Sequence, residues 1–438
     1  MAKYQQYNEY KDSGVEWLSQ LPVGWDIERT KRMLSLRREL VGANSLDYQL
    51  LSLTLRGVIP RDISNGDGKI PADFSTYQEV EKKDLIFCLF DIDETPRTVG
   101  LSPEKGMITG AYNVYKTSNR CSSRYAYYYF LHIDLRKGLR PFYTGLRKVV
   151  RSETFGNIKM PCPSYEEQAQ IANFLDHETA QIDTLIEKQQ TLIQLLKEKR
   201  QAVISHAVTK GLNPDAPMKD SGVEWLGEVP EHWKIAKLKW KASTTSGGTP
   251  TTSKYEDYYE DGYIPWIRTT DLNNDKLNET PVMITAKAVR DSACSLLPKN
   301  SVLLAMYGGA GSIGKHSLLN FESTINQAVC GVLPSEDFVP DYLHRFYEFY
   351  RPFWMIGAAG TRKDPNIGQD NIKEAKVLIP PLDEQKKVAD YLDKMQGHFD
   401  SLTESAEKAI QLMQERRTAL ISAAVTGKID VRGWRAPE

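Results

Sequence analysis

The stretch Lys11-Asp12-Ser13-Gly14-Val15-Glu16-Trp17-Leu18 occurs a second time in the same chain, as Lys219-Asp220-Ser221-Gly222-Val223-Glu224-Trp225-Leu226. The two copies are 208 positions apart, and the same spacing places Pro22 on Pro230 and Trp25 on Trp233. Eight identical residues in a row do not recur by chance, so the chain contains an internal duplication. A repeat of this length predicts two domains rather than a solenoid of short units.

A second pair of matching segments follows, one behind each copy. Pro163-Ser164-Tyr165-Glu166-Glu167-Gln168 corresponds to Pro380-Pro381-Leu382-Asp383-Glu384-Gln385, at a spacing of 217 positions. The order is therefore a short motif, a variable region and a helical motif, and then the same again. The variable regions, about 26–160 and 234–378, share little residue identity. We infer that a scaffold has been duplicated and that two inserts have diverged.

Both helical motifs show the pattern of a long coiled-coil helix. Residues 165–208 contain neither Gly nor Pro, and apolar residues recur at alternating spacings of three and four, as in a heptad seam. The second copy repeats this pattern. The side chains that we expect along the seam of partner helices are Ile171, Leu175, Ile182, Leu185, Leu192, Leu196, Val203, Val388, Leu392, Phe399, Leu402, Met413 and Leu420.

A helix of about 44 residues spans about 66 Å, and its narrow apolar stripe must be buried against a partner. The nearest partner is the other copy in the same chain, which would pair in the antiparallel direction at high effective concentration. Two other interpretations remain: surface helices on two globular cores, or a coiled coil between two chains. Polar seam positions, Glu178, Gln189 and Lys199, suggest that helices of other proteins pack there as well.

The two inserts read as mixed α/β with many short strands. Segments rich in β-branched and aromatic residues between turn residues predict strands near 48–55, 84–90, 110–115, 301–307 and 325–333. Helices are expected near 123–132 and 340–350. We therefore expect a mixed α/β (α+β) fold with two domains separated by two long antiparallel coiled-coil helices and an internal pseudo-two-fold. The expected division is 1–161, first domain; 162–212, first long helix; 213–380, second domain; 381–428, second long helix; and 429–438, tail.

Composition excludes several classes of protein. The 438 residues are 41% hydrophobic and 26% charged, which is typical of globular domains and excludes disorder and collagen-like repeats. The five cysteines form no C-x-x-C, so we expect free buried thiols rather than disulfides or zinc. Neither a signal-peptide core nor a run of 18 apolar residues is present, and we expect a cytoplasmic protein.

Charge gives only a weak indication of a nucleic-acid partner. The formal net charge of the chain is −1, but residues 1–160 carry a net charge of +5 and residues 213–380 carry −3. Basic residues recur beside Gly, Ser or Thr in loop-like contexts, at Arg56, at Arg147-Lys148 and at Arg362-Lys363. Such side chains can approach a phosphate backbone or a base edge. The alternative for each of them is an ordinary solvated surface charge.

One glycine-rich stretch resembles a nucleotide-binding loop. Gly309-Ala310-Gly311-Ser312-Ile313-Gly314-Lys315 follows a strand-like run, but His316 stands where a P-loop needs Ser or Thr to hold Mg²⁺. A helix should also follow, whereas residues 317–330 read as loop and strand. A glycine-rich strand connection is the better interpretation. A nucleotide-binding enzyme that uses this loop remains one alternative, and a coiled-coil adaptor without DNA contact is another; nucleotide binding and DNA binding, respectively, would distinguish them.

Taken together, these motifs resemble the specificity subunit of type I restriction-modification systems over nearly the whole chain. The resemblance rests on the duplicated Asp12–Leu18 block, on the Pro163 and Pro380 segments that each open a long helix, and on motifs within the inserts. In the second insert these are Ser246-Gly247-Gly248-Thr249-Pro250, Ile264-Pro265-Trp266-Ile267-Arg268-Thr269 with Asp271, and Gly311 to Lys315 with Thr324, Asn326 and Gln327. In the first insert, Gly106 to Tyr112 and Thr144-Gly145-Leu146-Arg147 look like a different subtype of target-recognition domain.

The resemblance implies a non-catalytic DNA-recognition subunit. Each target-recognition domain, 1–161 and 213–380, would read one half of a gapped, asymmetric double-stranded DNA site, and the helices would set the gap. Two methyltransferase subunits, which use S-adenosylmethionine to methylate adenine N6, would dock on the helices. Restriction-translocase subunits, which use ATP and Mg²⁺, would join them. We expect no catalytic residue, metal or cofactor in this chain. The residues expected to contact DNA are Arg56, Arg97, Arg147, Lys148, Gly247, Gly248, Thr249, Arg268, Thr269, Lys315, Asn326, Gln327, Arg362 and Lys363.

Overall fold

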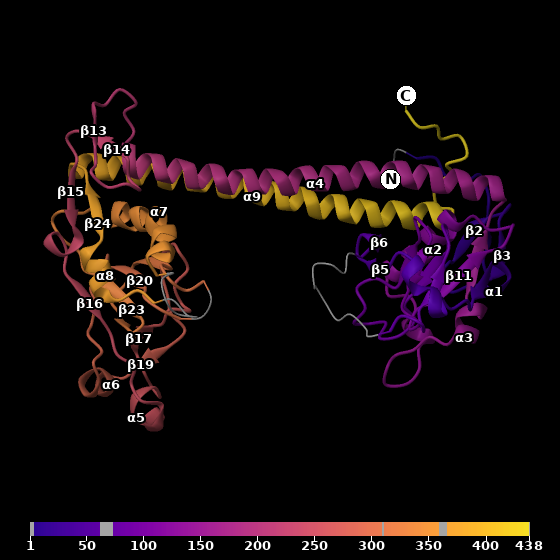
Figure 1. Ribbon diagram of the computed structural model, residues 1–438, viewed down its shortest axis with the longest axis horizontal. Helices are drawn as coiled ribbons and strands as arrows, with labels where there is room; N and C mark the ends of the chain where they lie inside the picture. Colours follow the sequence, from indigo (N-terminus) through magenta and orange to yellow (C-terminus); the bar gives the residue numbers. More distant parts are fainter. Residues whose placement is uncertain (1–3, 62–72, 309–310, 359–365, 438) are drawn as a thin grey trace. The chain divides into compact units, whose positions relative to one another are not determined.

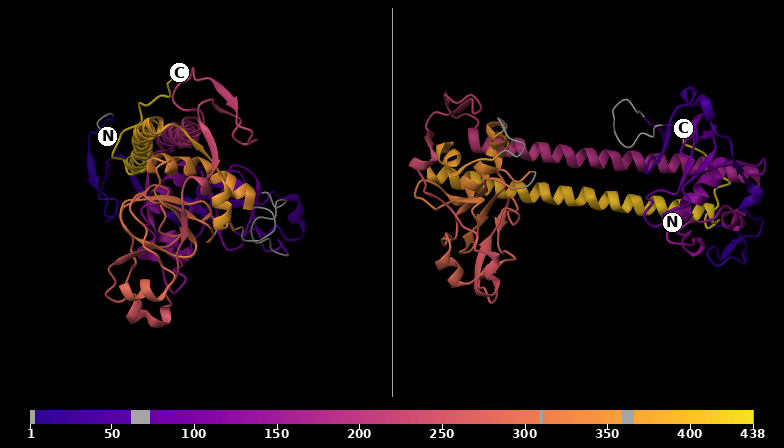
Figure 2. Two further views of the ribbon diagram at one scale, coloured as in Figure 1. Left: turned by 90° about the vertical axis from the view of Figure 1, so that its left-hand side faces the viewer. Right: turned by 60° about the horizontal axis from the view of Figure 1, so that its bottom comes forward.

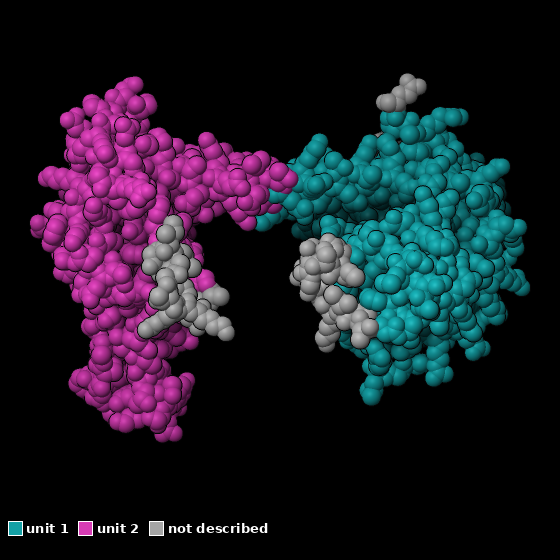
Figure 3. All heavy atoms as spheres, in the orientation of Figure 1, with its two compact units in different colours: residues 1–190, 407–438 teal, residues 191–406 magenta. Residues whose placement is uncertain are grey.

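The computed structural model describes residues 4–61, 73–308, 311–358 and 366–437. The chain forms two compact units (Figure 3): unit 1 is made of residues 1–190 and 407–438, and unit 2 of residues 191–406. Two long helices, α4 (Tyr165–Lys210) and α9 (Leu382–Val425), each contribute one part to each unit. The two long helices that the heptad pattern predicts are therefore confirmed, along with their starting points.

Unit 1 is built around a small antiparallel sheet. Within its described residues the strand order of this sheet is β4-β11-β8-β9, and helix α2 packs against it. The elements of unit 1 before α4 are β1 (Tyr10–Asp12), β2 (Gln20–Pro22), β3 (Asp26–Arg29), α1 (Thr30–Met33), β4 (Leu34–Arg37), η1 (Gly42–Asp47), β5 (Leu51–Thr54), β6 (Gly57–Pro60), β7 (Gln78–Val80), β8 (Leu85–Phe87), β9 (Val99–Leu101), β10 (Gly106–Ile108), β11 (Asn113–Thr117), α2 (Ser123–Leu135), η2 (Arg140–Phe142), α3 (Ser152–Asn157) and β12 (Lys159–Cys162).

Unit 2 contains a larger, mixed sheet. Its order among the described residues is β16-β23-β20-β21-β18, with β18 parallel to β21. The elements of unit 2 between α4 and α9 are β13 (Met218–Asp220), β14 (Glu228–Pro230), β15 (Lys234–Lys237), η3 (Leu238–Trp240), β16 (Thr244–Ser246), η4 (Thr252–Lys254), α5 (Tyr255–Tyr258), β17 (Ile264–Ile267), β18 (Lys276–Leu277), β19 (Met283–Ile284), α6 (Ala286–Asp291), β20 (Val302–Ala305), β21 (His316–Leu319), β22 (Thr324–Ile325), β23 (Val329–Val332), α7 (Pro340–Ala358), α8 (Gln369–Glu374) and β24 (Lys376–Ile379).

Within each unit, the local parts of α4 and α9 lie side by side (Figures 1 and 2). Unit 1 holds the N-terminal part of α4 and the C-terminal part of α9, and unit 2 holds the reverse, so the helices run antiparallel. In unit 1, Arg417 on α9 forms an ion pair with Asp183 on α4 at 2.9 Å. In unit 2, Ile204 and Leu392 share one buried core. The pairing within the chain that the duplication predicted is confirmed.

The repeated motif ties each insert to the start of its long helix through a tryptophan. In unit 1, the Nε1 of Trp25 donates to the carboxylate of Glu167 at 3.0 Å. In unit 2, the Nε1 of Trp233 donates to Glu384 at 2.8 Å. Both indole rings are fully buried. Because the donor and the acceptor come from different repeated segments, these bonds explain why the two segments are duplicated together.

A buried glutamine forms a second contact between each insert and the start of its long helix. This contact shows that the duplication extends into the inserts. The side chain of Gln168 donates to the carbonyl of Pro163 at 3.0 Å and accepts from the backbone N–H of Ser122 at 2.8 Å. The side chain of Gln385 makes the same bonds, to Pro380 at 2.9 Å and from Val339 at 2.8 Å. Ser122 and Val339 precede α2 and α7, so these helices are also copies. The inserts 26–160 and 234–378, which share little residue identity, therefore keep a common geometry at these helices.

Two further observations bear on the class of protein. All five cysteines are buried as free thiols. Among the helices in the described part of the chain, none is both long enough and apolar enough to span a bilayer.

Candidate nucleic-acid interface

In unit 1, an aromatic and basic cluster forms just beyond the end of β8. The ring of Tyr112 stacks on Phe90 with 6.0 Å between the centroids. The guanidinium of Arg147 lies over the same Phe90 ring, 5.3 Å from its centroid, and the Arg147 side chain is 73% exposed. The structure thus brings together the two first-insert motifs that ended in Tyr112 and Arg147. Phe90, at the end of a buried apolar run, was not predicted as a site residue.

Carboxylates beside this cluster divide the basic residues into two kinds. Lys148 pairs with Asp93 at 2.9 Å and with Glu94 at 2.7 Å. These hydrogen bonds raise the pKa of Lys148 and lower the pKa values of Asp93 and Glu94. Among the described residues, the guanidinium of Arg147 has one carboxylate partner, Asp91 at 3.5 Å. The charge of Lys148 is therefore largely compensated, whereas the Arg147 side chain stays largely exposed.

The other two candidates of the first insert lie near each other but differ in their surroundings. Arg56 is exposed in the turn between β5 and β6. Arg97 donates to the carbonyl of Leu55 at 3.2 Å, and its Nη1 lies 3.6 Å from the carboxylate of Asp134, which is buried. A buried carboxylate requires a compensating cation. The structure therefore gives Arg97 a partner inside the domain.

In unit 2, three segments cross closely and form a polar cluster. A Cβ at Gly247 would lie 1.6 Å from the carbonyl oxygen of Ile325, so only glycine permits this crossing. The next residue, Gly248, donates its N–H to the same carbonyl at 3.1 Å. Beyond the crossing, the hydroxyl of Thr249 donates to the side-chain oxygen of Gln327. The hydroxyl of Tyr307 donates to the Gln327 carbonyl at 3.1 Å.

The remaining candidates of unit 2 flank this cluster. The N–H of Asn326 donates to the carbonyl of Ile267 at 2.9 Å, which places Arg268 beside it. The Arg268 guanidinium binds Asp271 through two bonds of 3.1 and 3.0 Å, and these raise its pKa.

Thr269 is buried, and Lys315 is half-buried. Arg362 and Lys363 lie outside the described residues. Tyr307 was missed because an aromatic residue at a strand end gives no separate sequence signal.

The glycine-rich stretch before His316 lies between two antiparallel strands, β20 and β21. A P-loop places phosphate at the N-terminus of the helix that follows it. Here a strand follows, and residues 309 and 310 of the stretch lie outside the described part. The order strand, loop, strand agrees with a glycine-rich strand connection.

The seam residues of α4 and α9 fall into three groups by exposure. Ile171, Leu175, Ile182, Val388, Leu392, Phe399 and Leu420 are buried; Leu196, Val203 and Met413 are half-buried; and Leu185, Leu192 and Leu402 are exposed. Apart from Phe399, the buried ones belong to the cores in which an insert packs on the helices. The exposed leucines lie on the middle portions of the helices, Leu185 in unit 1 and Leu192 and Leu402 in unit 2.

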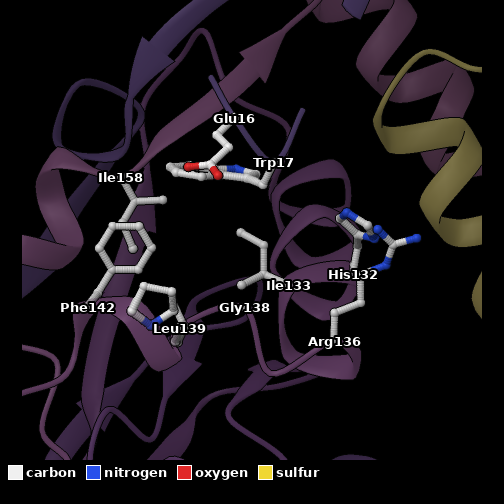
Figure 4. A pocket seen from close by; sticks show the side chains of 10 residues that line it. Glu16, Trp17, His132, Ile133, Arg136, Gly138, Leu139, Phe142 and Ile158 are labelled. Carbon is white, nitrogen blue, oxygen red and sulfur yellow. The ribbon is translucent and has the colours of Figure 1, made fainter. Parts of the chain in front are cut away.

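A pocket of about 530 Å³ in unit 1 opens beside Trp17 of the repeated motif (Figure 4). Its lining is mainly apolar, with Ile133 and Phe142 facing the indole. Burial, together with Arg136, lowers the pKa of His132 to about 4, so this imidazole is neutral at pH 7. Figure 4 shows Glu16 and His132 on different walls of the pocket, so these two side chains do not form an acid–base pair.

The fold and these clusters define a class: a duplicated scaffold of paired long helices that carries two different inserts, each with its own exposed polar and aromatic cluster. The family model described as the type I restriction modification DNA specificity domain matches residues 87–195 and 230–412. The chain belongs to this family.

Individual relatives agree with this assignment. The type I restriction enzyme StySPI specificity subunit of Salmonella potsdam is 29% identical over 208 residues, covering 46% of this chain and 44% of that protein. The EcoKI specificity subunit of Escherichia coli is 29% identical over 214 residues, covering 48% and 46%. The chain thus matches slightly less than half the length of these relatives.

Solved structures share the fold. A chain from a structure described as showing complex assembly and conformational transition of the type I R-M system has a TM-score of 0.71 at 14% identity, covering 92% of this chain and 98% of that one. The HsdS subunit from Thermoanaerobacter tengcongensis has a TM-score of 0.56 at 14% identity, covering 93% and 98%. At this identity the likeness concerns the fold alone.

Proposed function

We propose that this chain is the DNA-recognition subunit of a type I restriction-modification complex and that its two inserts read the two halves of a gapped, asymmetric site. The observation that carries the proposal is a contrast within one chain. The scaffold contacts are the same in both copies, whereas the partly exposed clusters differ: Phe90, Tyr112 and Arg147 in unit 1, and Thr249, Tyr307 and Gln327 in unit 2. Two copies of one scaffold that carry different polar surfaces are suited to bind two different half-sequences.

The proposed roles of the segments follow the repeat. Residues 1–161 and 213–380 are the two recognition domains, residues 162–212 and 381–428 are the spacer helices, and residues 429–438 form the tail. The exposed leucines of the helices support docking of two methyltransferase subunits. Those subunits bring S-adenosylmethionine, and translocase-nuclease subunits bring ATP and Mg²⁺. This chain contributes sequence recognition and no catalytic group.

The direct test is mapping of methylated adenines in a host that carries this chain with its partner subunits. We expect one bipartite motif with a fixed gap. The purified chain without partners is expected to transfer no methyl group from labelled S-adenosylmethionine. A motif without a gap, or methyl transfer by the pure chain, contradicts the proposal.

Replacing Arg147→Ala is expected to weaken binding of the specific site by about 1–3 kcal/mol, because a guanidinium that reads a base supplies this much discrimination. Preference should relax in one half of the site only. Competition binding with duplexes randomised in one half measures both effects. Arg32, which is exposed and pairs with Glu28, gives the control variant Arg32→Ala. A uniform loss with a smaller salt dependence indicates a phosphate contact instead.

Gln327→Ala is expected to relax the sequence preference in the other half of the DNA site. The side-chain amide of Gln327 offers a donor and an acceptor. Thr249 donates to its oxygen, and Tyr307 holds the backbone carbonyl of the same residue. The same competition assay should show lost preference in the half that Arg147→Ala leaves intact. If both variants relax the same half, the assignment of one half to each insert is wrong.

A further inference from the structure

A groove beside the long helices occurs in each unit, and among the described residues the chain covers it in unit 1 but not in unit 2. In unit 1 the groove contains Phe174 on α4, which is completely buried. The rings of Tyr4 and Trp434 meet Phe174 edge to face, with centroids 5.3 and 5.4 Å away. Gln170 donates its side-chain N–H to the carbonyl of Trp434. Aromatic side chains from both terminal segments therefore fill this groove.

The tail is held over the groove by further contacts. The N–H of Asp430 donates to the carbonyl of Gln5 at 2.8 Å, and the Arg432 guanidinium lies 4.9 Å from the centroid of the Tyr7 ring. Ile429, at the start of the tail, is only 2% exposed. In unit 1, the groove is thus occupied by an extended segment that carries an aromatic side chain.

The same positions in unit 2 are open. The spacing of 217 positions places Tyr391 on Phe174 and Leu212 on Ile429. Tyr391 is 37% exposed and Leu212 is 43% exposed, in contrast to their buried counterparts. They line a hollow of about 650 Å³ with Val203 and Pro214. Residues 213–217 lead on to β13 instead of folding back across the helices, so no aromatic side chain of this segment covers Tyr391.

We propose that the groove of unit 2 at Leu212 and Tyr391 binds a segment of a partner protein that carries an aromatic side chain next to carboxylates. The aromatic side chain is inferred from Tyr4 and Trp434 in the matching groove. The carboxylates are inferred from the charge of the lining. The titratable side chains that line the hollow and the adjoining pocket of about 220 Å³ are Lys199, Lys210, Lys387, His206, His232 and Glu384.

The single carboxylate in this lining is already engaged. Glu384 accepts from Trp233 at 2.8 Å and lies 2.7 Å from a ring nitrogen of His232. Lys387 occupies the position of Gln170, which in unit 1 donates to the bound segment.

The Nζ of Lys387 lies 3.4 Å from the exposed carboxylate of Asp383, and Lys210 donates to a neutral carbonyl, that of Glu228, at 3.2 Å. Together with Lys199, these ammonium groups outnumber the carboxylates at the groove. In the tail of a second copy of this chain, Arg432 and Arg435 flank Trp434, so the charges beside its aromatic side chain do not match.

The test uses the full chain and a synthetic peptide. The probe is a fluorescein-labelled peptide of residues 429–437 with Arg432→Glu and Arg435→Glu, which combines the aromatic side chain with carboxylates. We expect saturable binding by fluorescence anisotropy, and at least a tenfold higher Kd for the chain with Leu212→Glu. A peptide with the additional change Trp434→Ala should lose affinity to the same extent.

Leu412→Glu is the matched control, because Leu412 is also an exposed leucine and lies on a long helix outside this groove. Its Kd should equal that of the unchanged chain, and thermal unfolding confirms that both variants fold. Tyr391→Ala provides a second variant that adds no charge and is also expected to weaken binding. Absence of saturable binding, or equal binding by Leu212→Glu, overturns the proposal. Tighter binding of the unaltered, basic tail peptide overturns the acidic partner in favour of a second copy of the chain.

Discussion

Replacing Arg345 with Met is expected to lower the free energy of unfolding by about 3 kcal/mol, because it removes the shared cation of a buried ion-pair network. Glu348 and Asp393 are then left with one cation each, Arg200 and Lys276. The Arg345 side chain is 4% exposed on α7. It binds Glu348 and Asp393, each at 2.9 Å, and so fixes the insert of unit 2 to α9. Methionine keeps a similar volume but supplies no donor.

Chemical denaturation monitored by circular dichroism measures this loss. The matched control is Tyr128→Phe, because position 128 is the counterpart of position 345 in the first copy. The hydroxyl of Tyr128 donates to Asp176 at 2.7 Å, and Asp176 is the counterpart of Asp393. Removing this one hydrogen bond should cost about 1 kcal/mol. A loss for Arg345→Met no larger than that of the control contradicts the network's role in holding the insert.

The same pair of helices shows why sequence comparison found only part of the duplication. On α2, Arg124 pairs directly with Asp176. The counterpart of Arg124 on α7 is Asp341, which has the opposite charge, and Lys276 bridges it to Asp393 with bonds of 2.8 and 2.9 Å. The contact between insert and helix is preserved while the residues that make it have changed. Sequence identity is therefore lost although the geometry of the contact is kept. For this reason, α2 and α7 could be recognised as copies only from their place in the fold.

The scaffold was predictable for the opposite reason. Trp25 and Trp233, like Gln168 and Gln385, must meet several buried partners at once, so the residue types recur in both copies. Their spacing in the sequence was enough to predict two long helices and a common base.

The candidate interface was predictable only in outline, because its residues lie on loops that have no periodicity. Glycines marked one loop crossing correctly, since Gly247 lies where a side chain would strike the Ile325 carbonyl. Arg97, in contrast, looked like a surface cation in the sequence but lies beside the buried Asp134. Phe90 and Tyr307 became candidates only once the loops around them were placed in space.

Inserting four residues into each long helix is expected to widen the gap between the two half-sites by one to two base pairs. This expectation rests on the proposed reading of DNA by both inserts. Four helical residues add about 6 Å, and base pairs are about 3.4 Å apart along the duplex. The insertions belong between Gln190 and Thr191 in α4 and between Ala406 and Glu407 in α9, where each helix passes from one unit to the other. Both helices must be lengthened, because their antiparallel pairing would otherwise lose its register.

A four-residue insertion is a stutter, which a coiled coil accommodates by local unwinding, so both units should keep their folds. Mapping of methylated adenines in a host that carries the variant and its partner subunits measures the gap. The two half-sequences should stay the same, since neither insert is altered. Insertion into α4 alone is the control and should abolish modification, because the helices can no longer pair along both units. An unchanged gap with full modification would show that the length of the helices does not set the spacing. An altered half-sequence would show that the middle of the helices contributes to base recognition.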